Sequence, residues 1–300
     1  MNTVDDALSW DKFFKNAKSR KHYPPKKIDL FNRLVAHTEN FFLISAIGAF
    51  TPGYLMIITK ELLPSFSLIK DKNLEELKLL IKYVSEVLNK TYKRKVITFE
   101  HGMCACLGGL DRAHVHVMTI NKKINEKILR DSINKVLIDR KAGINSIDYN
   151  GYSFENIHDI NQIISDSKPG NYKINGKQLT IEDIRNNLNL NEWPISPRSH
   201  VMKGGHYVYF KSPFKSCSFL TNKNFQTQMG RQIIFEAEKK VNPELKKFSD
   251  KVLKDNLFAN IWKWQEFPFK DNMLETMSQM VDGFASIKTK LKKYNFKYFY

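Results

Sequence analysis

Two histidines lie two residues apart in segment 111–118, Asp-Arg-Ala-His-Val-His-Val-Met, whose alternating pattern is typical of a β-strand. Side chains at i and i+2 of a strand point to the same face of the sheet, so we expect His114 and His116 to project together. A neutral imidazole is a good nucleophile near pH 7 and also a good leaving group in the step that follows. The spacing therefore predicts a catalytic pair rather than one histidine buried for packing.

The histidine pair and the segments before it resemble the histidine-triad (HIT) superfamily, whose signature is His-x-His-x-His followed by apolar residues on a strand. Segment 41–60 looks like that family's two opening strands and their turn. A long amphipathic helix, the strand 96–102 and the histidine pair follow in the family's order. The resemblance covers about residues 28–122. It continues more weakly over 204–284, where 228–231 and 262–268 look like the carboxy-terminal extension of a bacterial branch.

The resemblance implies a hydrolase or nucleotidyltransferase that acts at the α-phosphate of a nucleotide through a nucleotidyl-histidine. In the family the middle histidine attacks phosphorus, and the backbone carbonyl at the first-histidine position orients its other ring nitrogen. His114 is then the nucleophile and Arg112 supplies the carbonyl. Arg112 replaces the first histidine, and Leu62 stands where relatives often have another. The backbone carbonyl of residue 112 is present whichever side chain the residue carries, so the mechanism is expected to persist. The rate and the choice of substrate stay open.

Other residues complete the expected catalytic site. His116 would hold a non-bridging phosphate oxygen or stabilise the imidazolium, and His101 would donate a proton to the leaving group, which is worth roughly 10²–10⁴ in rate. The backbone at Gly108 and Gly109 can approach a phosphate closely. For His101, a hydrogen-bonded histidine at a strand end is an equally good interpretation, and the two glycines equally suit an ordinary loop.

Further candidates would bind the substrate. Arg112, Lys60, Gln228 and Arg231 are candidate contacts to the nucleotide, and arginine can hold a phosphate with two parallel hydrogen bonds. For Lys60 and Arg231, a surface role is an equally good interpretation. Phe42 and Ile44 are candidates for the wall of a base pocket, with plain core burial as the alternative.

The composition excludes some classes of protein and leaves several partners open. A net charge of +17 and a pI near 9.6 favour anionic partners, which include nucleotides, nucleic acid and membrane surfaces. The basic residues gather at both ends, where the tail 286–300 interleaves lysines with aromatic residues. Such a tail could stack on single-stranded bases or dock on anionic lipid, whereas the commoner role is a solvated end or a clasp on its own domain. We expect a nucleotide or nucleotide conjugate as substrate, nucleic acid as a second partner, and a homodimer as one assembly to consider.

No apolar run of eighteen residues and no signal-peptide pattern occurs, which predicts a cytoplasmic protein without a membrane span. Three cysteines, Cys104, Cys106 and Cys217, fit a reducing compartment. Cys104 and Cys106 with the histidine pair could form a zinc site, but their spacing matches no common zinc pattern. We therefore predict neither a metal nor a cofactor.

Hydrophobic periodicity predicts an α+β fold, a mainly antiparallel sheet packed with helices plus an α/β carboxy-terminal extension. We expect strands within 30–37, 41–46, 53–59, 95–101 and 113–120, a hairpin at 205–220, and helices at 7–17, 73–92, 124–138, 223–240 and just after Thr180. The expected units are an N-terminal helix and basic segment (1–27), a HIT-like catalytic domain (28–140), a polar insertion (141–203), the extension (204–285) and the basic aromatic tail (286–300).

Three functions compete at this stage. The first is the HIT-like hydrolase or transferase, and the second is a catalytically weak protein that binds nucleotide or nucleic acid on the same fold. The third is a zinc hydrolase. The sequence contains no phosphate-binding Gly-x-x-x-x-Gly-Lys loop, no Gly-x-Gly-x-x-Gly fingerprint and no Gly-x-Ser-x-Gly elbow, which disfavours three other common enzyme classes.

Overall fold

The structure is a computed structural model. It describes residues 34–46, 48–102, 112–139, 147–149, 152–154, 171–174, 177–180, 193–194, 197–202, 204–214, 216–221, 229–247 and 270–298.

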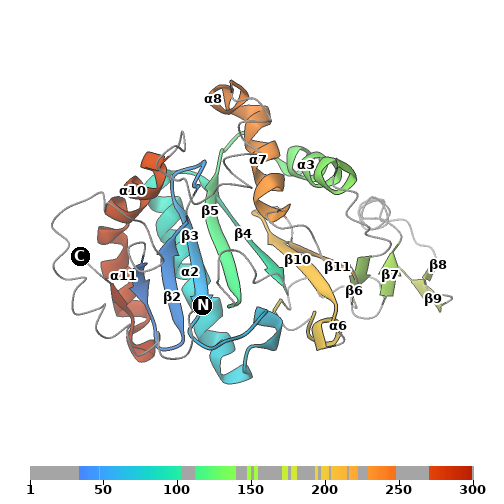
Figure 1. The fold of residues 1–300 in the computed structure, drawn as a ribbon, viewed down its shortest axis with the longest axis horizontal. Coiled ribbons are helices and arrows are strands. Elements are labelled where there is room, and N and C mark those ends of the chain that lie inside the picture. Colours follow the sequence, from blue (N-terminus) through green and yellow to red (C-terminus); the bar gives the residue numbers. More distant parts are fainter. Residues whose placement is uncertain are drawn as a thin grey trace.

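Eight strands form one antiparallel sheet in the order β11-β10-β4-β5-β3-β2-β1-β12 (Figure 1). The strands are β1 (Leu34–His37), β2 (Phe41–Ser45), β3 (Tyr54–Thr59), β4 (Lys95–Gly102), β5 (His114–Ile120), β10 (His206–Lys211), β11 (Ser216–Thr221) and the two-residue β12 (Lys297–Tyr298). Strand β5 lies at the centre, between β3 and β4. Its seven residues are all buried, as expected for a strand that is covered on both faces.

One face of the sheet packs against helix α2 (Asp71–Tyr92), which in turn contacts α11 (Val281–Lys290) (Figure 1). The apolar stripe of α2, including Leu77, Val84 and Leu88, is fully buried with Leu55 and Val115 from the sheet. Each such side chain contributes on the order of 1.5–3 kcal/mol when buried. The polar positions of α2 carry exposed lysines, so the helix is amphipathic as its sequence predicts.

The opposite face is approached by α7 (Met229–Val241), and α3 (Glu126–Asp139) packs on α7. Gly230 allows α7 to come close to the sheet, because a β-carbon there would meet the ring of Phe99 well inside van der Waals contact. Helix α10 (Lys270–Gln279) lies beside β2 and β3.

The remaining elements are short. They are η2 (Phe66–Leu68), β6 (Ile147–Tyr149), β7 (Tyr152–Phe154), β8 (Asn171–Ile174), β9 (Lys177–Thr180), α6 (Arg198–Met202), α8 (Pro243–Lys246) and η5 (Lys292–Tyr294).

The α+β class is confirmed, and each predicted strand and helix within residues 34–139 is present. The extension differs from expectation because its hairpin, β10 and β11, continues the main sheet beside β4. The described helices of the extension lie outside the sheet. The predicted helices at 7–17 and after Thr180, and residues 223–228 of the predicted helix 223–240, lie outside the described residues.

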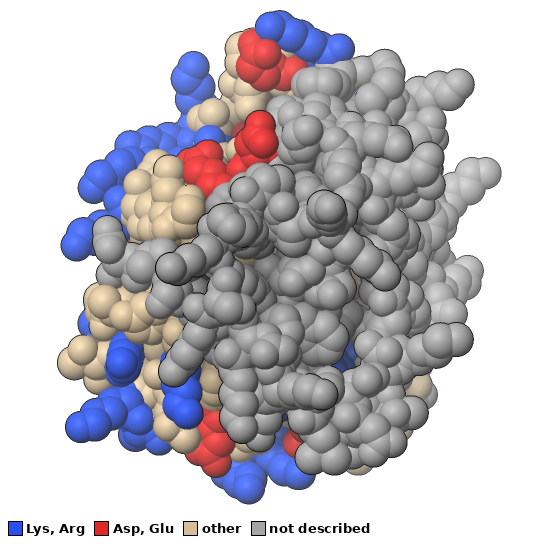
Figure 2. Space-filling model, turned by 60° about the vertical axis from the view of Figure 1, so that its left-hand side comes forward, with Lys and Arg blue, Asp and Glu red and all other residues tan. Residues whose placement is uncertain are grey.

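The end of the basic tail packs on its own sheet. Strand β12 pairs with β1, and Phe296 is buried against Phe284. The lysines between these aromatic residues are exposed, and Figure 2 shows Lys and Arg side chains gathered along one margin of the surface drawn in colour. Within the described part of the chain, no helix is long and apolar enough to cross a membrane.

Candidate functional site

The strand register places the predicted site residues on one face of the sheet, the face that α7 approaches. Antiparallel partners share a face, so the pairings define rows of neighbouring side chains. One row runs Phe42, Ile58, His114, and the next runs Ile44, Met56, His116, Phe99. The rings of His114 and His116 lie 5.1 Å apart between centroids. The two histidines therefore project together, as their spacing predicts.

His114 is oriented by the backbone. Its Nδ1 lies 3.0 Å from the carbonyl oxygen of Arg112, which can only accept a hydrogen bond. Nδ1 therefore carries the proton, and Nε2 keeps its lone pair. Burial lowers the pKa of His114, although the Arg112 carbonyl acts to raise it. A neutral ring with an unprotonated Nε2 is the nucleophilic form of histidine.

His116 is held by two aromatic residues. Its ring stacks on Phe99, with centroids 4.3 Å apart and an angle of 10° between the planes. Its Nδ1 lies 2.8 Å from the hydroxyl of Tyr54. Burial lowers the pKa of His116 well below its ordinary value, and His114, Arg231 and His101 lower it further. This imidazole therefore remains neutral through the physiological range.

His101 lies near the end of β4, two residues after Phe99 and on the same face. Its electrostatic effect on His116 places it in the same cluster, and it is 9% exposed. The structure thus brings together the three histidines predicted as catalytic.

Arg231 belongs to this cluster through α7. Its guanidinium lies over the ring of Tyr54, 5.4 Å from the centroid, and hydrogen-bonds that side chain. Its Nη2 also donates to the carbonyl oxygen of Gly48. Gly48 has a φ of +68° and leaves no room for a β-carbon beside the guanidinium, so glycine is required there. In this structure Arg231 is buried behind Tyr54 rather than exposed as a contact for phosphate.

Two further cations on this face, Lys60 and Arg112, bind backbone carbonyls. Lys60 donates to the carbonyl of Thr38 at 2.6 Å and lies 5.1 Å from the centroid of the Phe42 ring. Arg112 donates through Nη1 to the carbonyl of Lys60. Leu62 is half exposed. To bind a phosphate, the side chain of Lys60 or Arg112 would have to give up its hydrogen bond to a backbone carbonyl.

Phe42 and Ile44 lie on the histidine face but are almost fully buried. Both are two strands away from β5, with Ile58 and Met56 in between. This placement fits a hydrophobic wall beside His114, and it equally fits the core.

Several predicted residues lie outside the described part of the chain, namely Gly108, Gly109, Gln228, Cys104 and Cys106. Among the described residues, no group of three or more His, Cys, Asp or Glu side chains could hold a metal ion.

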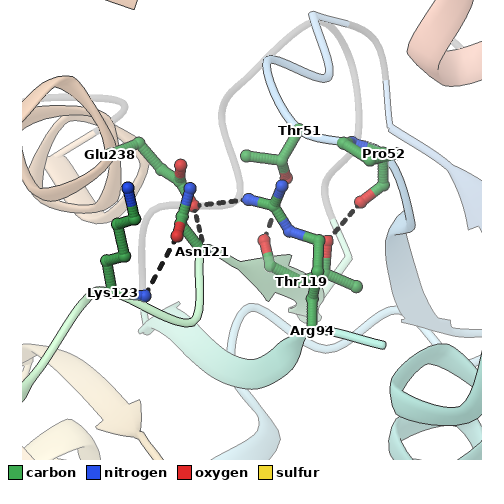
Figure 3. Close-up of polar contacts among 7 residues, drawn as sticks. All are labelled: Thr51, Pro52, Arg94, Thr119, Asn121, Lys123 and Glu238. Atoms are coloured by element: carbon green, nitrogen blue, oxygen red, sulfur yellow. Dashed lines mark hydrogen bonds and ion pairs between the residues drawn. The ribbon is translucent and has the colours of Figure 1, made fainter. Parts of the chain in front are cut away.

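Helix α7 is fixed against the sheet by a buried carboxylate two helical turns after Arg231. Oε1 of Glu238 accepts from Arg94 Nη2 at 2.9 Å and from the backbone N–H of Asn121 at 2.6 Å (Figure 3). Arg94 lies between α2 and β4, whereas Asn121 follows β5. Residues seven apart share a face of a helix, so Glu238 fixes the face of α7 that carries Arg231.

The turn between β2 and β3 is fixed to β5 in the same region. Thr51 Oγ1 donates to the carbonyl of Thr119 at 3.0 Å, and Thr119 Oγ1 donates to the carbonyl of Pro52 (Figure 3). This turn carries Gly48, whose carbonyl accepts the hydrogen bond from Arg231. Both partners of that contact are thus held to the central strands.

Tyr54 and Phe99 were not predicted as site residues. Tyr54 begins the alternating strand 54–59, and Phe99 lies two residues before His101. Strand alternation alone could place Phe99 on the face of His101. Finding Tyr54 also required the pairing of β3 with β5, which the sequence pattern does not contain.

Neither a protein-family model nor a curated protein matches this chain.

Proposed function

We propose that this protein is a HIT-like nucleotide hydrolase or nucleotidyltransferase that acts at an α-phosphate through a nucleotidyl group on His114. The supporting observation is the contact between His114 Nδ1 and the Arg112 carbonyl, which leaves Nε2 as a neutral nucleophile beside His116. The order β2, β3, α2, β4, β5 agrees with the order of parts that motivated the HIT resemblance.

The reaction has two steps. The lone pair of His114 Nε2 attacks phosphorus, the bond from phosphorus to the leaving group breaks, and its electron pair goes to the leaving group. Water or another phosphate then attacks the same phosphorus, the phosphorus–nitrogen bond breaks, and Nε2 regains its lone pair. The proton of an attacking water is released to solvent. His116 would hold a non-bridging oxygen, and His101 would give a proton to leaving groups that need one.

The experiment is capture of the covalent intermediate. The protein is mixed rapidly with adenosine 5′-phosphoramidate or diadenosine triphosphate, quenched, and examined by intact-mass spectrometry. We expect a mass gain of one adenylyl group that peptide mapping assigns to His114, and loss of both the adduct and turnover in His114→Ala. Tyr83→Phe is the control, because Tyr83 lies on α2, which packs on the face of the sheet opposite the histidine row.

Arg112→His adds a sharper test of the orienting carbonyl. If only the backbone of residue 112 is needed, kcat/KM should stay within about tenfold of the native value, a barrier change of roughly 1.4 kcal/mol. A gain of about a thousandfold would instead mark the native protein as a degraded enzyme. An intact fold with no adduct and no turnover of either substrate would reject the proposal.

The basic surface favours a second candidate, a nucleic-acid-binding protein. Helices α2 and α11 contact each other, and with η5 and β12 they present nine exposed lysines: Lys72, Lys78, Lys82, Lys90, Lys288, Lys290, Lys292, Lys293 and Lys297. Glu75 and Glu86 pair with only two of them. Partly exposed tyrosines lie between them, and Lys290 is 4.6 Å from the centroid of the Tyr83 ring.

Salt-dependent binding of a fluorescent single-stranded oligonucleotide tests this candidate. Replacing Lys78, Lys82 and Lys288 with alanine should weaken binding and reduce the salt slope by about 0.7 for each phosphate that the variant no longer neutralises. Lys240→Ala, at an exposed position of α7, is the control. Equal effects per removed charge in the two variants would indicate attraction by net charge alone.

A further inference from the structure

We propose that Arg231 and Tyr54 are positioning residues that hold His116 in one tautomer, with Nδ1 unprotonated and Nε2–H kept as a fixed hydrogen-bond donor. This inference deepens the proposed function, on which its catalytic part rests. The tautomer itself can be measured without any substrate.

Arg231 sets the direction of the hydrogen bonds that lead through Tyr54 to His116. A guanidinium has only N–H donors, so in its hydrogen bond with Tyr54 the phenolic oxygen must accept. A second hydrogen bond of this side chain runs to the carbonyl of Gly48, which fixes its position. Burial lowers the pKa of Arg231, but Tyr54 acts to raise it, and arginine keeps its charge in proteins.

Tyr54 in turn donates its hydroxyl hydrogen to His116. Burial raises the pKa of Tyr54 above its ordinary value, so the phenol keeps its proton. Its oxygen accepts from Arg231, and its own hydrogen is therefore directed to the partner 2.8 Å away, His116 Nδ1. A nitrogen that accepts a hydrogen bond is unprotonated, which places the ring proton on Nε2.

The surroundings of His116 exclude the doubly protonated ring. The ionisable groups that act on it are His114, Arg231 and His101, and all three lower its pKa. Phe99 stacks on one face of the ring and supplies no charge. Glu100, which lies between Phe99 and His101 in β4, accepts hydrogen bonds from Phe66, Trp193 and Tyr207 on the opposite face of the sheet. Both protonation and rotation of the ring are thus disfavoured.

The two histidines consequently have opposite tautomers. The Arg112 carbonyl leaves His114 Nε2 as a lone pair, whereas Tyr54 leaves His116 Nε2 as a donor. A phosphate between them would meet a nucleophile and a neutral N–H donor. The extension from residue 204 onward would then contribute to the site through Tyr54 rather than by direct contact with the ligand.

The first test is long-range ¹H–¹⁵N NMR of the histidine rings at neutral pH, with the His116 signals identified by their loss in His116→Gln. We expect the downfield shift of an unprotonated nitrogen at Nδ1 and a protonated Nε2. In Tyr54→Phe we expect a mixture of tautomers, and in Arg231→Met the same change. A His116 protonated at Nδ1 in the native protein, or an unchanged spectrum in Tyr54→Phe, would overturn the proposal.

Matched variants separate positioning from simple loss of structure. Arg231→Lys keeps a cationic donor and should restore most of the native His116 spectrum, whereas Tyr83→Phe, on α2, should leave it unchanged. Tyr54→Phe removes one oxygen and keeps the fold testable even if Arg231→Met does not fold. Where turnover is found, kcat/KM of Tyr54→Phe should fall about 10²-fold, the usual effect of losing one oriented donor. The native tautomer pattern without any turnover would retain this proposal and reject the proposed function.

Discussion

Glu100 and His101 are neighbours in β4, but their side chains lie on opposite faces of the sheet. His101 belongs to the histidine cluster, whereas Glu100 is buried on the side of α2. There its carboxylate accepts from the backbone N–H of Phe66 and from Trp193 Nε1, each at 2.8 Å, and from the hydroxyl of Tyr207. The backbone of one strand thus separates a buried acid from the site.

Glu100 should make stability depend on pH. Burial raises its pKa to about 7 in the folded state, although its hydrogen bonds act to lower it. Below the unfolded pKa of about 4.3 both states are protonated. Between there and pH 7 only the unfolded state ionises, so the free energy of unfolding should fall by roughly 3–4 kcal/mol as the pH rises, and then level off.

Urea denaturation of the native protein and of Glu100→Gln at several pH values measures this contribution. The glutamine amide must face one of the three donors, so the variant will be destabilised by a constant amount. The free energy of unfolding of the native protein should therefore exceed that of Glu100→Gln by more at acid pH than at neutral pH. Parallel curves from pH 4 to pH 8 would show that folding does not raise the pKa of Glu100.

The ion pair of Glu238 and Arg94 should contribute more to stability than a surface pair on the same helix. Glu238 is fully buried and accepts two hydrogen bonds, so Glu238→Gln leaves Arg94 without its charge partner (Figure 3). We expect a loss of about 1–3 kcal/mol. The control is Glu236→Gln, whose partner Lys135 is exposed, with an expected loss below about 1 kcal/mol. Equal losses, measured as denaturation midpoints, would contradict a role for Glu238 in fixing α7.

The periodic elements could be predicted from the sequence because local patterns determine them. The stripe of α2 recurs at helical spacing, and β3 and β5 alternate between two faces, so the shared face of His114 and His116 follows from their spacing alone. The contact of His114 with Arg112 is also local, since it joins residues two apart.

The contacts that complete the site join residues far apart in sequence. Tyr54 meets His116 through the register of β3 on β5, and Arg231 reaches Tyr54 from a helix nearly 180 residues later. Hydrophobic periodicity does not encode which strands pair. For the same reason, the sequence predicts the hairpin at 205–220 but not its pairing with β4. It likewise identifies the basic tail but not the pairing of β12 with β1.

Gly230 allows α7 to approach the ring on which His116 stacks. A β-carbon there would overlap Phe99, and the neighbours of Phe99 in the core leave little freedom for it to move. Gly230→Ala should destabilise the protein by about 1–3 kcal/mol, the usual cost of overpacking. The ring signals of His116 should also shift. Lys240→Ala, on the exposed side of α7, should change neither, and a native His116 spectrum in Gly230→Ala would show that the helix yields instead of Phe99.

His101 should matter most for substrates whose leaving group needs a proton. His116 stays neutral and His114 is the proposed nucleophile, so among the three histidines His101 is the one left to act as an acid in the proposed reaction. An amine leaving group must be protonated, whereas p-nitrophenolate departs readily as an anion. His101→Gln should therefore reduce kcat/KM for adenosine 5′-phosphoramidate by roughly 10²–10⁴-fold. For the p-nitrophenyl ester of AMP, the loss should stay below about tenfold. Equal losses for the two substrates would mean that His101 supports the fold of the site and that the leaving-group proton comes from elsewhere.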